Sequence, residues 1–192
     1  MPGRVFTELA EIAGEQHGYV TTDDAAAHGI APINLSRMAQ RRVLERRATG
    51  VYRLPLTPPG PLDAYVEATL WPQRGVRGVL SHETALELYE LSDVNPAKIH
   101  LTLPAGYRVR RQVPAAYRLH HEDLDPAAVT LFEGIPIVAP AHAIRQAAAA
   151  HLGDALLAQA IDHGERNGRL TRREAAQLRR ELGVRRGGGM RR

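Results

Sequence analysis

The first apolar positions of the chain recur three and four residues apart, which is the spacing of one face of a helix. This pattern predicts a helix over residues 6–17. A short second helix over residues 23–28 is predicted after Thr21 and Thr22, whose hydroxyls suit the N-cap position. A third helix, over residues 32–41, begins at a proline and carries an apolar stripe along one side. Three short helices are therefore predicted in succession.

Two β-prone runs follow the third helix. They cover residues 43–46 and 51–54 and flank a segment that ends in Gly50, which suits a hairpin turn. Three helices followed by a hairpin is the order of a winged helix-turn-helix domain. In such domains the third helix enters the major groove of DNA and the hairpin contacts the neighbouring backbone. The predicted domain covers residues 1–58.

A proline cluster separates this region from the rest of the chain. Residues 55–61 contain four prolines and a glycine, which continue neither a helix nor a central strand. We expect a boundary there and a second domain over residues 62–184. In it the patterns predict helices over residues 63–70, 81–91, 141–151, 154–164 and 171–182, and strands over residues 76–80, 98–103, 116–119, 129–132 and 135–138. The fold class is therefore α+β, a winged helix-turn-helix followed by a mixed domain that ends in helices.

Local signals refine the second half of the chain. Thr171, with Glu174 three residues later, predicts a capping box, and Ser81 is expected to cap its helix. Pro136 places the last strand toward an edge of its sheet. Residues 185–192, which are rich in arginine and glycine, are expected to form a disordered basic tail.

Composition excludes several classes of protein. The chain has no cysteine, which excludes a disulfide framework, a thiolate zinc site and a cysteine nucleophile. Its 44% hydrophobic and 24% charged residues are ordinary for a globular protein of 192 residues. No stretch approaches the roughly 18 apolar residues of a membrane span, and the chain opens without an apolar signal sequence. We expect a cytoplasmic protein that does not contact a membrane.

Charge is distributed unevenly around a net value of +4. Residues 1–36 hold five acidic residues and one arginine, whereas residues 37–53 hold six arginines and one glutamate. Clustered arginine of this density indicates a phosphate-binding face. The alternative is a solvated surface in a chain that uses arginine almost everywhere in place of lysine.

Amide and guanidinium side chains line the third helix opposite its apolar stripe. Such side chains make paired hydrogen bonds to base edges. The predicted base-reading residues are Asn34, Ser36, Arg37, Gln40 and Arg41. Arginines at the start of the hairpin and within it are expected to hold phosphates. They are Arg42, Arg46, Arg47 and Arg53. The alternative is a winged helix that contacts protein and leaves its arginines in solvent.

Several stretches of the sequence resemble a known family. Residues 18–22, 26–30 and 44–54 look like the winged-helix domain of AbiEi-type antitoxins from type IV toxin–antitoxin systems. Residues 81–86 and 98–104 are similar to the start of that family's C-terminal domain.

The resemblance implies an antitoxin that represses its own operon through its N-terminal domain and counters a nucleotidyltransferase-type toxin through its C-terminal domain. The implied partners are double-stranded operator DNA and that toxin. The match at the end of the hairpin falls on Gly50, Val51 and Tyr52, of which Tyr52 is expected to pack inside while its arginine neighbours contact DNA. Self-association of two copies on operator repeats is expected from the two-fold logic of helix-turn-helix proteins.

Two other functions stay open. One is a winged-helix transcription regulator whose C-terminal domain senses a ligand or mediates dimerisation. The other is an enzyme that uses the His120–Asp125 cluster, but adjacent strand residues point to opposite faces and the usual metal spacings are absent. Ser81, His82 and Glu83 have the residue types of a triad, yet sequence neighbours seldom orient as nucleophile and base. No catalytic residue, metal site or cofactor is therefore predicted.

Overall fold

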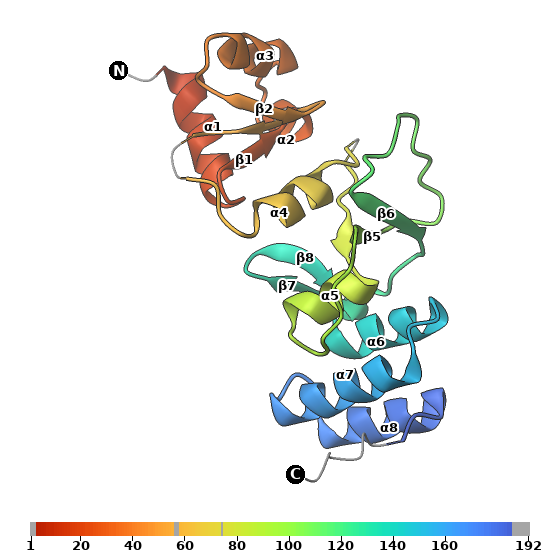
Figure 1. Ribbon diagram of the computed structural model, residues 1–192. Helices are drawn as coiled ribbons and strands as arrows, with labels where there is room; N and C mark the ends of the chain where they lie inside the picture. Colours follow the sequence, from red (N-terminus) through yellow and green to blue (C-terminus); the bar gives the residue numbers. More distant parts are fainter. Residues whose placement is uncertain (1–2, 56–57, 74, 186–192) are drawn as a thin grey trace. The chain divides into compact units, whose positions relative to one another are not determined.

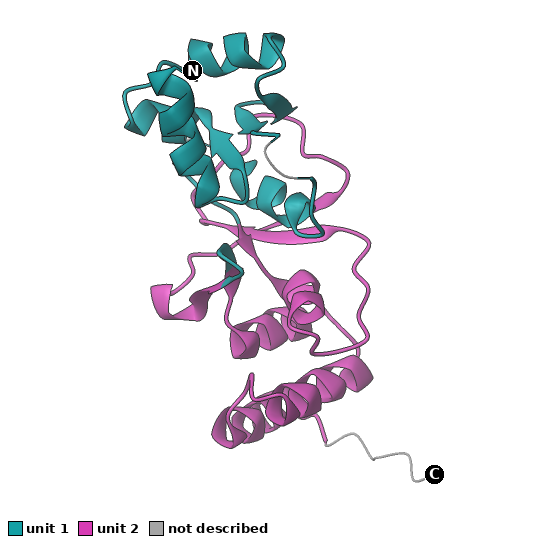
Figure 2. Ribbon diagram, turned by 90° about the vertical axis from the view of Figure 1, so that its left-hand side faces the viewer, with its two compact units in different colours: residues 1–78, 132–136 teal, residues 79–131, 137–192 magenta. Residues whose placement is uncertain are grey.

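The computed structural model of the chain describes residues 3–55, 58–73 and 75–185 (Figure 1). It forms two compact units, which are coloured separately in Figure 2. Unit 1 consists of residues 1–78 and 132–136, and unit 2 consists of residues 79–131 and 137–192. Part of the proline linker, residues 56–57, and residues 186–192 of the predicted basic tail lie outside the described residues.

Unit 1 begins with the predicted order of helices and hairpin. The helices are α1 (Arg4–Gly14), α2 (Thr22–Ala27) and α3 (Pro32–Gln40), and the hairpin strands are β2 (Glu45–Ala48) and β3 (Val51–Arg53). This is the winged helix-turn-helix order, so the predicted N-terminal fold is confirmed. Helix α1 ends earlier than predicted, because residues 15–18 form turns in which Gly18 has φ +86°.

A strand that the sequence pattern does not predict completes the small sheet. Strand β1 (Tyr19–Thr21) pairs antiparallel with β3, which gives the strand order β1-β3-β2. All its residues are buried, so it lacks the alternation of polar and apolar positions that marks a half-buried strand. Helix α4 (Asp63–Leu70) contacts β1 and extends unit 1 beyond the winged helix.

One apolar core joins the helices and the hairpin of unit 1. Leu9 of α1, Leu35 of α3 and Leu44, next to β2, are buried in it. Tyr52 of β3 belongs to the same core and is 2% exposed, so the expectation that Tyr52 packs inside is confirmed. Each side chain of this size contributes about 1.5–3 kcal/mol when it is buried. The core thereby fixes which side of α3 stays exposed.

Caps form at two of the three predicted places. The hydroxyl of Thr21 accepts from the N–H of Asp24, and the Asp24 carboxylate accepts from the N–H of Thr21, which is a capping box. Thr171 and Glu174 make the same pair of bonds. Ser81 occupies an N-cap position but makes no capping hydrogen bond, which corrects the prediction. Its hydroxyl lies 3.0 Å from the ring of the next residue, His82, instead of reaching back to the helix.

A five-stranded sheet has the order β6-β5-β4-β8-β7. Its strands are β4 (Val79–Leu80), β5 (Ile99–Leu103), β6 (Tyr117–His121), β7 (Val129–Phe132) and β8 (Ile135–Val138). Strand β8 lies between β4 and β7, so the edge position predicted from Pro136 is wrong. The reason is that β4 is very short and its register with β8 places Leu80 opposite Ile137, beside the proline. The missing N–H of Pro136 is tolerated next to so short a ladder.

The helices of unit 2 pack in succession along the chain. They are α5 (His82–Leu88), α6 (Pro140–Ala149), α7 (Asp154–Arg166) and α8 (Arg172–Leu182), and a short 3-10 turn, η1 (Pro126–Ala128), precedes β7. Helix α5 contacts β5 and α6, and α6, α7 and α8 contact one another. Within the described residues, no helix has the length and apolar character needed to cross a membrane.

Candidate nucleic-acid interface

Helix α3 packs against the core of unit 1 with its apolar side and leaves its polar side exposed. Pro32 occupies its first turn, where the missing N–H has no partner to lose. Leu35 is wholly buried, and Met38 and Ala39 pack against the same core. These contacts follow the apolar stripe that the sequence predicts. The polar side of the helix is thereby turned away from the core.

Three predicted base-reading residues lie exposed on α3 or directly after it. They are Arg37, Gln40 and Arg41. In the described part of the chain, neither Arg37 nor Arg41 makes an ion pair with a carboxylate. Guanidinium groups without a protein partner remain available to guanine edges and to phosphates.

The other two predicted residues of α3 are less exposed. Asn34 is half-buried. The hydroxyl of Ser36 lies 3.1 Å from the phenol oxygen of Tyr52, so Ser36 contacts β3. The structure therefore brings Arg37, Gln40 and Arg41 together on one exposed surface and places Ser36 at the junction of helix and sheet.

An apolar residue of α3 that is not among the predicted base-reading residues is also exposed. Ile33 is 53% exposed in the first turn of the helix. Recognition helices contact base edges with their N-terminal residues, and an apolar side chain there can contact a thymine methyl group. The available signal was that Ile33 falls outside the stripe formed by Leu35 and Met38.

Two of the four arginines expected to hold phosphates are both exposed and without an ion pair to a described residue. Arg42 follows α3 with a backbone φ of +60°, and Arg46 lies on β2 opposite Tyr52. The register of β2 against β3 shifts between Arg46 and Ala48, which is a bulge. Bulges re-aim side chains and increase the local twist of a strand. Both arginines make no ion pair among the residues that the structure describes.

Arg53 is placed differently from the sequence expectation. It is 2% exposed, and its guanidinium lies 3.4 Å from the carboxylate of Asp63 and 3.5 Å from that of Glu45. A group buried among protein carboxylates has no surface for a DNA phosphate. We therefore exclude Arg53 from the candidate interface, because the α4 segment that supplies Asp63 covers it.

Arg47 is bound to helix α4. Its Nε donates to Glu67 at 2.6 Å, and the Tyr19 hydroxyl donates to the same carboxylate at 2.8 Å. The Glu67 carboxylate raises the pKa of Arg47, and burial raises the pKa of the Tyr19 phenol. Arg47 is thus a link between the hairpin and α4, and phosphate binding by it would compete with Glu67.

The hairpin turn packs against the chain that follows α4. The side-chain amide of Gln73 donates to the carbonyl of Thr49. Gly50 has φ +73°, and a Cβ atom there would collide with the Gln73 amide. Glycine suits this position because it adopts a positive φ without strain and has no Cβ atom to collide with Gln73. This docking was not predicted, because Thr49 and Gln73 are far apart in sequence and carry no periodic signal.

The residues of the His120–Asp125 cluster mostly serve local structure. Asp123 accepts from the N–H of Ala105, and Asp125 accepts from the N–H of Ala127. His121 is exposed, whereas His120 is half-buried on the other face of β6. The prediction that sequence neighbours here would separate onto two faces agrees with this placement.

Residues 8–55 match the protein family described as "Transcriptional regulator, AbiEi antitoxin". The matched segment begins within helix α1 and contains the rest of the winged helix, including the whole candidate interface. Among curated proteins, none matches the chain.

One solved structure similar to this chain is the crystal structure of RV2827C protein from Mycobacterium tuberculosis. The TM-score is 0.50, the sequences are 17% identical, and the alignment covers 94% of this chain and 72% of the other. At this identity the likeness concerns the fold alone.

Proposed function

Because residues 8–55 match the family of AbiEi antitoxin transcriptional regulators, we propose that this protein is an antitoxin that represses its own operon by binding operator DNA. The observation that carries the proposal is the exposed surface of Arg37, Gln40 and Arg41 on a winged helix whose arginines there lack protein carboxylate partners. The proposal includes no catalysed reaction.

In the proposed complex, helix α3 enters the major groove. Arg37 and Arg41 pair with guanine, and Gln40 pairs with adenine through its amide. Ile33 contacts a thymine methyl group. Arg42 and Arg46 hold phosphates beside the groove and contribute affinity for any sequence. Two copies bind operator repeats spaced by about one helical turn.

The second part of the proposal concerns the toxin. Residues 81–86 and 98–104 resemble the C-terminal domain of the same antitoxins, which implies a nucleotidyltransferase-type toxin as the partner. These residues belong to unit 2, whereas the DNA-reading surface belongs to unit 1. We therefore infer that neutralisation and DNA binding use different surfaces of the chain.

The test uses the full chain and the gene product encoded beside it. Wild-type chain should rescue the growth of a host that expresses the neighbouring protein, and it should silence a reporter placed behind its own upstream DNA. A variant with Arg37→Ala and Arg41→Ala should lose repression and keep rescue. A control variant with Arg172→Ala and Arg173→Ala, two exposed arginines of α8, should keep both activities. Repression that persists in the α3 variant would contradict the assigned DNA surface.

A second candidate function has support from a pocket in unit 2. The pocket has a volume of about 610 Å³ and is lined in part by Arg118, Glu122, Arg145 and Gln146. A pocket of this size in which a few polar side chains converge favours a regulator that senses a small ligand. Two results together would support this function over the antitoxin. The product of the adjacent gene would not slow the growth of the host, and the DNA affinity of the chain would change when a small molecule is added.

A further inference from the structure

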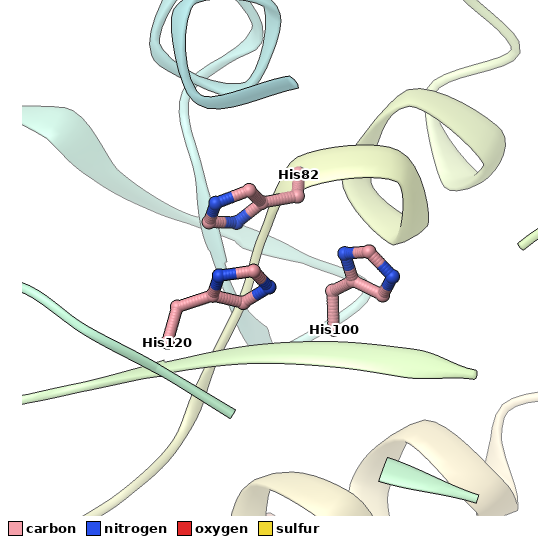
Figure 3. A group of neighbouring side chains, drawn as sticks. All are labelled: His82, His100 and His120. Carbon is pink, nitrogen blue, oxygen red and sulfur yellow. The ribbon is translucent and has the colours of Figure 1, made fainter. Parts of the chain in front are cut away.

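Three histidines from separate elements converge in unit 2. His82 is the first residue of α5, His100 lies on β5 and His120 lies on β6. Figure 3 shows the ring of His82 above that of His120 and the ring of His100 beside them, and one ring nitrogen from each lies within 4.8 Å of the others. In the parallel β5–β6 register, His100 lies opposite Arg118, two residues before His120. Residues two apart share a face of a strand, which places both rings on one side of the sheet.

Ring nitrogens in this cluster are buried without a protein partner. His82 is 7% exposed and His100 is 3% exposed. Nδ1 of His100 and Nε2 of His120 are buried, and neither atom has a hydrogen-bond partner among the described residues. Buried polar atoms in native proteins are nearly always satisfied, and an ion is one of the partners that explain an exception.

The rings are in the protonation state that binds metal. Burial is the main cause that lowers the pKa of His82 to about 3, and that of His100 and of His120 to about 4. Burial thus favours the neutral imidazole, which is the form that offers a lone pair to a metal ion.

Charged side chains near the three histidines have opposite effects on the binding of a cation. The Arg118 guanidinium lowers the pKa of all three histidines and disfavours a cation. The Glu122 carboxylate raises the pKa of His120 and favours one. Glu122 is fixed there, since it accepts from the Gln146 amide at 2.6 Å and lies 3.3 Å from Nε2 of His142.

An orienting group and an open side complete the arrangement. The Ser81 hydroxyl lies 3.0 Å from Nδ1 of His82, which leaves Nε2 of the same ring for another partner. A hydrogen bond at the second ring nitrogen is the usual way in which a metal-binding histidine is oriented. His82, His120, Glu122 and His142 line the pocket of about 610 Å³, so the cluster is open toward it.

We propose that His82, His100 and His120 bind one divalent transition-metal ion, for which Zn²⁺ is the preferred candidate. Imidazole nitrogen suits zinc, and three protein ligands leave a fourth position open to the pocket. Nitrogen ligands of a tetrahedral zinc ion lie about 3.4 Å apart, so the ligand nitrogens, which lie within 4.8 Å of one another, approach by up to about 1.4 Å on binding. The rings of His82 and His120 are stacked with centroids 3.5 Å apart, and their faces tilt away from each other as the two nitrogens turn toward the ion. This site does not depend on the proposed DNA-binding function.

The experiment uses the full chain without a histidine tag, freed of metal by a chelator. Zn²⁺ is added in competition with a chromophoric chelator, and Co²⁺ is added separately to record its visible absorption spectrum. The variants are His120→Gln and His82→Gln. The matched control is His121→Gln, because this exposed neighbour of His120 lies on the opposite face of the same strand. X-ray absorption at the zinc edge of the wild-type chain counts the imidazole ligands.

We expect one Zn²⁺ per chain, a tetrahedral Co²⁺ spectrum and three imidazole ligands. Each ligand variant should bind at least about tenfold more weakly, and the control should bind like wild type. Circular dichroism shows whether each variant folds. If a variant does not fold, the number of imidazole ligands is taken from the X-ray absorption data of the wild-type chain. Binding that is no weaker in the ligand variants than in the control, or no stoichiometric binding by the wild type, would overturn the proposal.

Discussion

The Ser36 hydroxyl of α3 lies 3.1 Å from the hydroxyl of Tyr52 on β3. Tyr52 is almost wholly buried in the core of unit 1, so this contact links helix α3 to the hairpin at the edge of that core. The sequence pattern predicts that Ser36 reads bases, but its hydroxyl is used within the protein.

The first prediction concerns this contact. Ser36→Ala and Tyr52→Phe should each lower the free energy of unfolding by about 0.5–1.5 kcal/mol, because each removes one hydroxyl–hydroxyl hydrogen bond. The free energy of unfolding of the double variant should lie within about 0.5 kcal/mol of that of the less stable single variant, because both substitutions remove the same hydrogen bond. Urea unfolding measures all three. Fully additive losses would mean that the two hydroxyls act independently.

The second prediction concerns the DNA surface. Arg37→Ala or Arg41→Ala should weaken operator binding by about 1–3 kcal/mol and relax sequence preference, because each removes a contact to a base edge. Arg46→Ala should weaken binding to all DNA alike and reduce the salt slope by about 1, because it removes a phosphate contact. Fluorescence anisotropy at several salt concentrations separates the two behaviours. Equal affinity in all three variants would contradict the assigned surface.

The third prediction separates Arg53 from Arg46. Arg53→Ala should lower the free energy of unfolding by about 3 kcal/mol, because it leaves the Asp63 carboxylate, which is 17% exposed, without its guanidinium. Arg46→Ala should change stability by about 0.5 kcal/mol or less, because Arg46 is exposed. Thermal or urea unfolding of the two variants provides the comparison. A stable Arg53→Ala protein that has lost DNA affinity would restore Arg53 to the interface.

The fourth prediction uses a matched pair of glycines. Gly29 and Gly50 have φ values of +71° and +73°, but an added Cβ atom would meet neighbouring atoms only at Gly50, where they belong to Gln73. Gly29→Ala should cost about 1 kcal/mol from the left-handed backbone alone. Gly50→Ala should cost more, because the Gln73 amide must also leave Thr49. Equal losses in chemical denaturation would show that the turn tolerates the displacement of Gln73.

The fifth prediction concerns pH. The pKa of His82 is lowered to about 3 and that of His100 to about 4, mainly by burial, whereas unfolded histidine titrates near 6.5. Below about pH 6.5 the unfolded chain therefore binds protons that the folded chain does not, and stability should fall as the pH drops toward these values. At pH 5 each group should cost up to about 2 kcal/mol relative to pH 7.5.

Urea unfolding at the two pH values, in the presence of a chelator, measures this loss. His100→Gln should reduce the pH dependence, and His121→Gln should leave it unchanged. A wild-type protein whose stability does not change between the two pH values would contradict the assigned protonation states.

Features that depend on residues close together in the chain are predictable from the amino-acid sequence alone. The spacing of apolar positions predicts α3 and its buried Leu35, and the Thr171–Glu174 spacing predicts the capping box. Exposed Arg37 and Arg41 follow from the same periodicity, because a side chain opposite the apolar stripe of a helix faces away from its core. These signals are local and need no knowledge of what packs against the element.

Which polar groups are bound within the protein depends on contacts between segments that are distant in the chain. Arg53 and Arg46 look alike in the sequence, but within the described part of the chain Asp63 of α4 pairs with Arg53 and not with Arg46. His82, His100 and His120 come from a helix and two strands, and none has a metal-binding spacing to the next. Their meeting depends on the register of β5 with β6 and on the packing of α5 against β5. Contacts between such distant segments depend on packing and have no local signal in the sequence, so this histidine cluster could not be predicted from the sequence.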